Sequence, residues 1–189
     1  KQVELTSKYF RDMVMKDYSD WQSTIFREFI QNSVDAGSTI INFKYNGKYL
    51  LCQDNGRGMS KSTLENALLK LGGSEKQNSS IGGFGKAKEI LYFSWDSWAV
   101  HSQGTVAIGQ GPSYKIQLSP ITKGVTAKIQ IDKALGTEQN ILSLIETYYF
   151  KCNILCDVFF NDKKLERKKQ HEKKIRYNIE GLGSLYDAN

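Results

Sequence analysis

The chain has 189 residues, of which 40% are hydrophobic and 24% are charged, so it is long enough for one domain with a substantial core. Its net charge of +6 is moderate. No apolar run approaches the roughly 20 residues of a membrane-spanning helix, and we expect a cytoplasmic protein without membrane contact.

Apolar periodicity and turn signals in the first half of the chain predict, in order, helices at 6–15 and 21–34, strands at 40–45 and 48–53, and a helix at 61–71. Ser19 or Asp20 can cap the second helix, and Ser60 can cap the third. Asn46-Gly47 is the strongest two-residue hairpin signal available between the two strands. The polar, glycine-containing stretch 72–82 is typical of a mobile loop.

The second half predicts, in order, a short helix at 86–91, strands at 97–102, 105–109, 114–118 and 125–131, a helix at 138–150 and a strand at 154–160. The tail after Ile175 has no clear period. Helices followed by hairpins and a run of antiparallel strands favour an α+β fold. We expect a two-layer sandwich with helices on one face of a mixed, mostly antiparallel sheet, rather than a doubly wound parallel sheet.

Two groups of residues favour ordinary structural roles. The three cysteines Cys52, Cys152 and Cys156 are an odd set without metal-binding spacing, so we expect them to be reduced and buried. The basic run at 163–176 could contact nucleic-acid phosphates, but a solvated hairpin arm or an unshielded face near a domain boundary is the preferred interpretation.

The first chemical motif is an acidic and amide stripe on the second predicted helix. Glu28, Asn32 and Asp35 stand at positions i, i+4 and i+7, which places them on one helical face. An amide oxygen suits magnesium, and a carboxylate one turn away can accept a proton from an attacking water. Taken alone, the stripe is more typical of an ordinary amphipathic helix.

The second motif begins where a predicted strand ends. Asp54 follows a mostly apolar strand and enters a turn with Gly56 and Gly58. A carboxylate there can accept a hydrogen bond from the exocyclic amine of adenine, and glycines let the backbone approach a flat base. A plain hairpin or a calcium loop is the alternative, but the further acidic residues of a calcium loop are missing.

The third motif is a glycine-rich loop at residues 82–86, which ends at Lys86. Its backbone N–H groups and the lysine charge favour phosphate. It is not a Walker A sequence, because Ala87 stands where that motif has Ser or Thr, and it lacks the strand–loop–helix context of a Rossmann fingerprint.

In this order the three motifs resemble the GHKL group, which comprises gyrase B, the ninety-kilodalton heat-shock chaperone, histidine kinases and MutL. The resemblance covers residues 9–131 and implies the Bergerat fold. It leaves 132–189 as a helix, a strand and a basic C-terminal extension of a single ATP-binding domain. Residues 81–86 more loosely resemble GHKL-type proteins of bacteriophages. Because the chain starts with Lys1, we expect it to be a fragment of a larger protein.

The resemblance implies ATP as the ligand, with adenine on Asp54, Mg²⁺ on Asn32 and phosphates on the 82–86 loop. Glu28 then corresponds to the general base of the hydrolysing members. The nucleotide-binding residues implied in this way are Asn32, Asp35, Ala36, Asp54, Gly56, Gly58, Met59, Gly72, Ser74, Lys76, Gly82, Gly83, Phe84, Gly85, Lys86 and Thr126.

Three departures from the family pattern are visible. Ala87 replaces a further glycine of the phosphate loop, and the usual Gly-Thr pair reads Gly124-Val125-Thr126. Either Thr126 shifts inward or the adenine contact is lost, since neighbouring strand residues face opposite sides. The lysine-bearing transducer domain of the family is not recognisable in 132–189.

We therefore expect an ATP-binding domain with weak magnesium-dependent ATPase activity that acts as a nucleotide-driven switch. Its partners would be a second copy on nucleotide binding, or a downstream domain or protein. A module that binds ATP or ADP without hydrolysis is the main alternative. A histidine-kinase role is less favoured, because His101 and His171 lie on a predicted strand and in a charged run rather than on a dimerisation helix.

Overall fold

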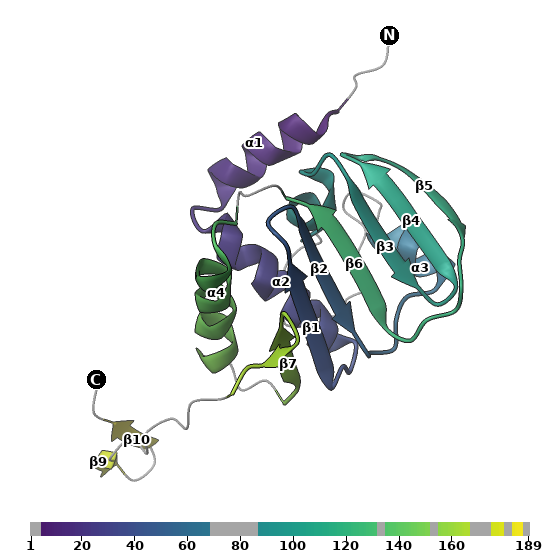
Figure 1. Ribbon diagram of the computed structural model, residues 1–189. Helices are drawn as coiled ribbons and strands as arrows, with labels where there is room; N and C mark the ends of the chain where they lie inside the picture. The colour runs from purple at the N-terminus through teal and green to yellow at the C-terminus, as the bar shows by residue number, and fades with distance from the viewer. Residues whose placement is uncertain are drawn as a thin grey trace.

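The computed structural model describes residues 5–68, 87–131, 135–151, 155–166, 175–179 and 183–186 (Figure 1). The helical elements are α1 (Ser7–Asp17), α2 (Trp21–Asp35), α3 (Lys61–Thr63) and α4 (Glu138–Lys151), with π-helical turns η1 (Leu64–Leu68) and η2 (Glu89–Phe93). The strands are β1 (Ile40–Tyr45), β2 (Tyr49–Asp54), β3 (Trp98–Ser102), β4 (Thr105–Gln110), β5 (Ser113–Leu118), β6 (Val125–Gln130), β7 (Asp157–Phe160), β8 (Lys163–Lys164), β9 (Ile175–Ile179) and β10 (Gly183–Tyr186).

Eight strands form one open sheet in the order β5-β4-β3-β6-β2-β1-β7-β8. Every neighbouring pair in it is antiparallel except β1 with β7, which is parallel. The strands β9 and β10 pair in a separate two-stranded antiparallel sheet. The mixed, mostly antiparallel sheet with helices confirms the predicted α+β sandwich and excludes a doubly wound parallel sheet for the described residues.

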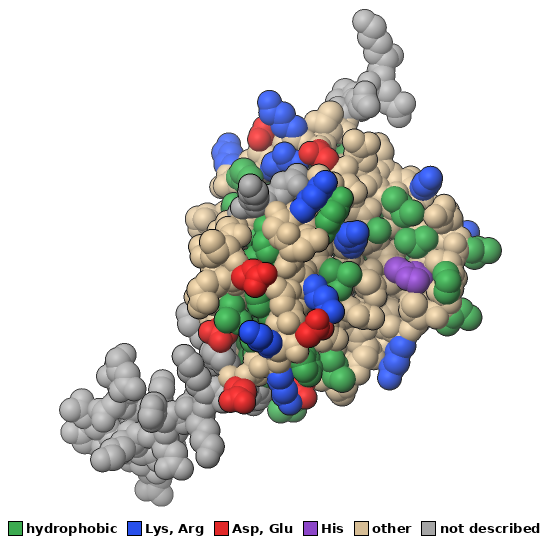
Figure 2. Space-filling view, viewed as in Figure 1, with side chains coloured by type: hydrophobic (Ala, Val, Ile, Leu, Met, Phe, Trp, Pro, Cys, Tyr) green, Lys and Arg blue, Asp and Glu red, His purple; other side chains and the backbone are tan. Residues whose placement is uncertain are grey.

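One face of the sheet is buried and the other is open. A row of directly paired residues crosses five strands on the buried face, and each is at most 3% exposed: Phe43, Cys52, Ala127, Val100 and Ala107. The intervening residues of these strands point to the opposite face, as period-two alternation requires. Figure 2 shows that this open face carries a mixture of charged, polar and hydrophobic side chains.

The helices cover the buried face. The Phe26 ring of α2 lies 5.4 Å from the Phe43 ring of β1, and the Phe93 ring of η2 lies 6.3 Å from the Trp98 ring of β3. Both strand residues point into the core, so α2 and η2 lie on the same side of the sheet. On α4, the Tyr148 hydroxyl accepts a hydrogen bond from Gln31 of α2.

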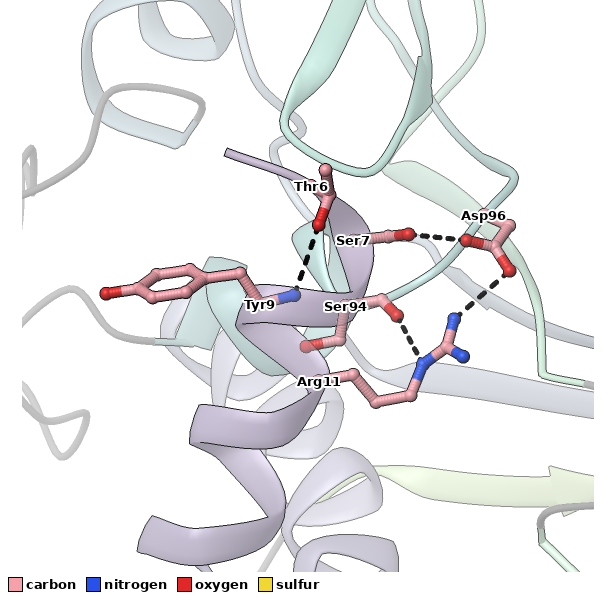
Figure 3. Close-up of polar contacts among 6 residues, drawn as sticks. All are labelled: Thr6, Ser7, Tyr9, Arg11, Ser94 and Asp96. Atoms are coloured by element: carbon pink, nitrogen blue, oxygen red, sulfur yellow. Dashed lines mark hydrogen bonds and ion pairs between the residues drawn. The ribbon is translucent and has the colours of Figure 1, made fainter. Parts of the chain in front are cut away.

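Helix α1 is held against the segment between η2 and β3 (Figure 3). Thr6 caps the helix by accepting a hydrogen bond from the Tyr9 N–H. The Ser7 hydroxyl donates to Asp96, and Arg11 donates to both Asp96 (3.2 Å) and the Ser94 carbonyl (3.0 Å). These contacts fix the N-terminal helix to residues that are about 85 positions away in the sequence.

Several residues predicted to cap helices or form a turn have these roles in the structure. Asp20 accepts a hydrogen bond from Ser23 N–H at the start of α2, and Ser60 accepts one from Thr63 N–H at the start of α3. Asn46 accepts hydrogen bonds from the main chain of the β1–β2 turn, in which Gly47 has φ +84°. Local turn and capping chemistry therefore determined these boundaries.

Other segments differ from the predictions. The helix predicted at 61–71 has only one α-helical turn before the π-helical η1, and the helix predicted at 86–91 continues as the π-helical η2. The tail after Ile175, for which the sequence shows no clear period, contains the paired strands β9 and β10. The loop predicted at 72–82 lies outside the described residues.

Cys52 and Cys156 are reduced and buried, as predicted, whereas Cys152 lies outside the described residues. Within the described residues, no group of three metal-ligating side chains is assembled, and no helix is both long and apolar enough to cross a bilayer. Of the basic run, Lys163 and Lys164 form β8, and residues 167–174 are not described.

Candidate functional site

Asp54 is the last residue of β2 and the one acidic side chain among the buried residues of the described chain. It shares its face with Cys52 and Leu50, so strand alternation points its carboxylate toward the helical layer rather than toward the open face. Only 8% of the residue is exposed. Such a carboxylate needs hydrogen-bond donors, since an isolated buried charge is costly.

Three donors from different segments reach Asp54. The Ser33 hydroxyl of α2 donates to Oδ2 at 3.2 Å, and the Ser38 hydroxyl donates to Oδ1 at 3.1 Å. The Gly56 N–H donates to Oδ1 at 2.8 Å. A carboxylate can accept about four hydrogen bonds, so Oδ2, with one donor, has acceptor capacity left.

The turn after Asp54 is tied to the end of α2. The Arg57 N–H donates to the Ala36 carbonyl at 2.9 Å, and the Arg57 guanidinium donates to the Asp35 carbonyl. Asn55 accepts hydrogen bonds from the main-chain N–H groups of Thr39 and Ile40 at 2.8 and 3.0 Å. The turn therefore has a defined position relative to the stripe on α2.

A second set of contacts connects this turn to β3 and β6. The Ser102 hydroxyl accepts a hydrogen bond from the Met59 N–H at 2.8 Å and donates to the Gly124 carbonyl at 2.7 Å. Ser102 is fully buried at the end of β3. One hydroxyl thus joins the segment after Asp54 to the residue that precedes β6.

The glycines stand where a side chain would not fit. A Cβ on Gly56 would lie 2.6 Å from the Ser38 hydroxyl, and a Cβ on Gly58 would lie 2.7 Å from the Ser102 hydroxyl. A Cβ on Gly124 would lie 2.8 Å from Asp54 Oδ1. Gly58 and Gly124 also have φ of +73° and +69°, a conformation that favours glycine.

The polar stripe of α2 is half-buried. Glu28, Asn32 and Asp35 each have intermediate exposure, and the Glu28 side chain is 13% exposed. Arg27 Nη2 lies 3.5 Å from Glu28 Oε1. Burial, followed by the charges of Glu28 and Glu89, raises the pKa of Tyr18, so both carboxylates act on the same hydroxyl.

The charge of Asp54 affects its buried neighbours. Burial raises the pKa of the Cys52 thiol, and the nearby Asp54 carboxylate raises it further. Burial, and then Cys52 and Asp54, also raises the pKa of Tyr92. Cys52 and Tyr92 are therefore neutral donors or apolar contacts around the carboxylate, not alternative nucleophiles.

Residues 20–109 match the family model described as histidine kinase-, DNA gyrase B- and HSP90-like ATPase. This match supports membership of the GHKL ATPase family. The matched segment contains Asp54 and its donors Ser33, Ser38 and Gly56. A comparison with curated proteins finds no match.

Domains of the GHKL family bind ATP, generally with Mg²⁺. Asp54 fits the exocyclic amine of an adenine base, because its Oδ2 can accept another hydrogen bond. The amide oxygen of Asn32 is of the kind that Mg²⁺ accepts.

The GHKL-type site is assembled only in part by the described residues. Asp54, Gly56, Gly58 and Met59 lie together with the main chain of Ala36. The other predicted nucleotide-binding residues of the segment 72–86 lie outside the described residues: Gly72, Ser74, Lys76, Gly82, Gly83, Phe84, Gly85 and Lys86.

Strand pairing does not bring Thr126 to Asp54. Thr126 pairs with Gln53 and His101, so it lies on the open face of the sheet, whereas Asp54 lies on the buried face. The neighbouring Val125 pairs with the buried Ser102 and packs against the core. Because the pairing of β6 shows no register shift, Val125 takes the inward position and Thr126 faces the open side of the sheet.

Three serines of the site were not predicted from the sequence: Ser33, Ser38 and Ser102. Two of them carry a recognisable signal. Ser33 continues the buried helical stripe of Phe26 and Phe29, and Ser102 continues the inward alternation of Trp98 and Val100. A polar residue at such an apolar position needs a hydrogen-bond partner, which here is the site itself.

Proposed function

We propose that this chain is an ATP-binding domain that hydrolyses ATP slowly with Mg²⁺ and serves as a nucleotide-driven conformational switch. The observation that carries the proposal is the buried carboxylate of Asp54, held by Ser33, Ser38 and Gly56 within a segment that matches a GHKL ATPase model. A carboxylate that is oriented before the ligand arrives is suited to recognise a donor group on a base.

Asp54 would distinguish adenine from guanine. The exocyclic amine of adenine is a donor, whereas guanine has an acceptor oxygen at the corresponding position. Oδ2 of Asp54 carries one hydrogen bond, from Ser33, and would accept a second from the amine. A guanine oxygen facing the same carboxylate would leave two acceptors opposed, which disfavours binding.

Glu28 and Asn32 would act at the phosphate end. Asn32 would hold Mg²⁺ through its amide oxygen, and the ion would offset phosphate charge. Glu28 lies one helical turn earlier, on the same face of α2, and would accept a proton from the attacking water. The 13% exposure of its side chain limits the bulk water that competes for the carboxylate.

The switch role rests on the sequence. The residues Gly82, Gly83, Gly85 and Lys86 would contact the phosphates through main-chain N–H groups and a lysine charge. The response to ATP would pass to a second copy of the chain, or to a further domain or partner protein.

A second candidate is a module that binds ATP or ADP without hydrolysing it. Arg27 lies 3.5 Å from Glu28 Oε1, so a guanidinium occupies one side of the proposed base. A conformation that retains this ion pair would keep water from that oxygen. The rate of ATP hydrolysis by the Arg27→Ala variant separates the candidates. If the ion pair with Arg27 inhibits the module, removing Arg27 frees Glu28 and should raise this rate.

Calorimetry with ATP, ADP and GTP, combined with a phosphate-release assay, tests the proposal. Asp54→Asn keeps the size of the side chain and removes its charge, so we expect ATP affinity to fall at least tenfold while the protein remains folded. Glu28→Gln should keep ATP binding and abolish turnover. Glu138→Gln, an exposed change at the start of α4, is the matched control.

Unchanged ATP affinity in Asp54→Asn would refute the binding proposal. Equal, nonzero phosphate release by wild type and Glu28→Gln would remove Glu28 from the chemistry. Tight ATP binding with no turnover in any variant would favour the non-hydrolysing module.

A further inference from the structure

The two edges of the eight-stranded sheet are of different kinds. One edge is β8, which has two residues, Lys163 and Lys164. Short, lysine-bearing edge strands protect a sheet against the addition of another strand. The other edge is β5, which has six residues and forms the outermost strand of the sheet (Figure 1). β5 lacks this protection, apart from a single lysine.

The β4–β5 pairing determines which main-chain groups of β5 face outward. The Ser119 N–H donates to the Gly104 carbonyl at 2.9 Å, and the register continues through β5 without a shift. In an antiparallel ladder, residues bonded to the partner strand alternate with residues whose N–H and C=O groups point away. Tyr114, Ile116 and Leu118 therefore direct their main-chain groups to the open edge. No described strand pairs with them there.

The same three residues carry apolar side chains on the core side of the sheet. Tyr114 packs 6.1 Å from the buried Trp98 ring and is still 40% exposed, and Ile116 packs against the core. Leu118 is 87% exposed, and Ile121 in the following loop is 88% exposed. Figure 2 shows hydrophobic side chains along this margin of the molecule. The core layer is thus left incomplete where the hydrogen-bonding edge is open.

We propose that β5 pairs with β5 of a second copy of this chain, antiparallel and about a two-fold axis at Ile116. In this register Tyr114 lies opposite the partner's Leu118, and Ile116 lies opposite the partner's Ile116. Lys115 lies opposite the partner's Gln117. The contact continues both sheets into one and is a form of strand addition to an exposed edge.

The pattern of β5 favours a second copy over an unrelated strand. The residues around Ile116 are symmetric in character, so an isologous pair places apolar side chains against apolar ones on the core side. Lys115 is the one charged residue of β5, and the two-fold register sets it against an amide rather than another lysine. In this register β5 therefore pairs apolar residues with apolar residues and places no like charges opposite each other.

The proposed contact does not depend on ATP. No residue of β5 belongs to the group around Asp54, so the dimer should form without nucleotide. A chain that stays monomeric would therefore count against the β5 contact alone, and a chain that fails to bind ATP would count against the ATP site alone.

Sedimentation velocity and light scattering of the nucleotide-free chain test the pairing. We expect a concentration-dependent dimer. Gln117→Lys places a lysine opposite the partner's Lys115 at two symmetric positions, and like charges directly opposite should weaken the dimer roughly 2- to 30-fold. Gln117→Glu places an opposite charge there and should strengthen it by a similar factor. Gln117 is exposed, so neither change should disturb the folded monomer, which circular dichroism checks.

Ser113→Lys is the matched control, because it adds the same charge to β5 outside the central pairs and should have a smaller effect. A wild-type chain that stays monomeric across the accessible concentrations would overturn the proposal. A dimer that responds equally to Gln117→Lys and Gln117→Glu would also overturn it, since the contact would then lie elsewhere. Binding of a strand-forming peptide by a monomeric chain would assign the edge to another partner and not to a second copy.

Discussion

Gly124 lies directly against Asp54. A Cβ on Gly124 would be 2.7 Å from the Asp54 carbonyl carbon and 2.8 Å from Oδ1, and the φ of Gly124 is +69°. The residue that precedes β6 therefore determines whether the carboxylate at the end of β2 can keep its position.

Gly124→Ala should lower both stability and ATP affinity. The positive φ costs about 1–3 kcal/mol for a residue with a side chain, and the methyl group also has to displace Asp54. Gly47→Ala is the control, because Gly47 has φ +84° and no atom within 4 Å of an added Cβ. Urea denaturation and calorimetry measure the two effects. If Gly124→Ala costs no more than Gly47→Ala, the contact with Asp54 imposes no constraint.

Ser102→Ala should destabilise the turn after Asp54. The fully buried hydroxyl accepts from the Met59 N–H and donates to the Gly124 carbonyl, so its removal leaves a buried donor and a buried acceptor. We expect a loss of about 1–3 kcal/mol in the free energy of unfolding, together with weaker ATP binding. Ser113→Ala on the exposed edge strand is the control. A change in unfolding midpoint as small as that of the control would contradict the assigned role.

The attachment of α1 should weaken in acid. The hydrogen bond from Ser7, with a further contribution from Arg11, lowers the pKa of Asp96 below its ordinary value of 3.8, while burial acts in the opposite direction. Because the folded-state pKa is below that of the unfolded chain, this stabilisation is present above pH 3.8 and disappears as the pH falls through the folded-state value.

Asp96→Asn tests this pH dependence. The difference in stability between wild type and Asp96→Asn should shrink as the pH is lowered from neutral through the folded-state pKa. Tryptophan fluorescence should follow the transition, since Arg11 lies 5.8 Å from the Trp95 ring. Asp12→Asn, an exposed change on α1, is the control. A difference that does not vary with pH would exclude Asp96 as the group that titrates.

Cys52 should be unreactive in the folded protein. Its side chain lies in the core with 3% exposure, and burial raises the pKa of its thiol, so little thiolate is present or accessible. In a variant with Cys152→Ser and Cys156→Ser, a disulfide reagent should react only after denaturation. Leu51→Cys in a chain lacking the three native cysteines is the control, because Leu51 points to the opposite face of the sheet. Rapid labelling of Cys52 in native buffer would show that the buried face opens.

Tertiary structure decided which residues of the predicted site meet. The sequence placed Asp54 at a strand end and placed Glu28, Asn32 and Asp35 on one helical face, because both statements follow from local periodicity. It left open whether Thr126 or its neighbour turns inward. That choice depends on the register of β6 against β2 and β3, which pairs Val125 with Ser102. Register is a property of strand pairs, and no single strand contains it.

By itself the sequence determined the local chemistry: caps at Asp20 and Ser60, the turn at Asn46-Gly47, the alternating strands and the motif order that indicates the family. These features depend on neighbours within a few positions, so they can be predicted from the sequence alone. Only the folded chain placed β7 parallel to β1 and brought Ser33, Ser38 and Gly124 to one carboxylate. Two of the three donors to the buried Asp54 carboxylate, Ser33 and Ser38, lie 21 and 16 positions away, so long-range packing had to supply them.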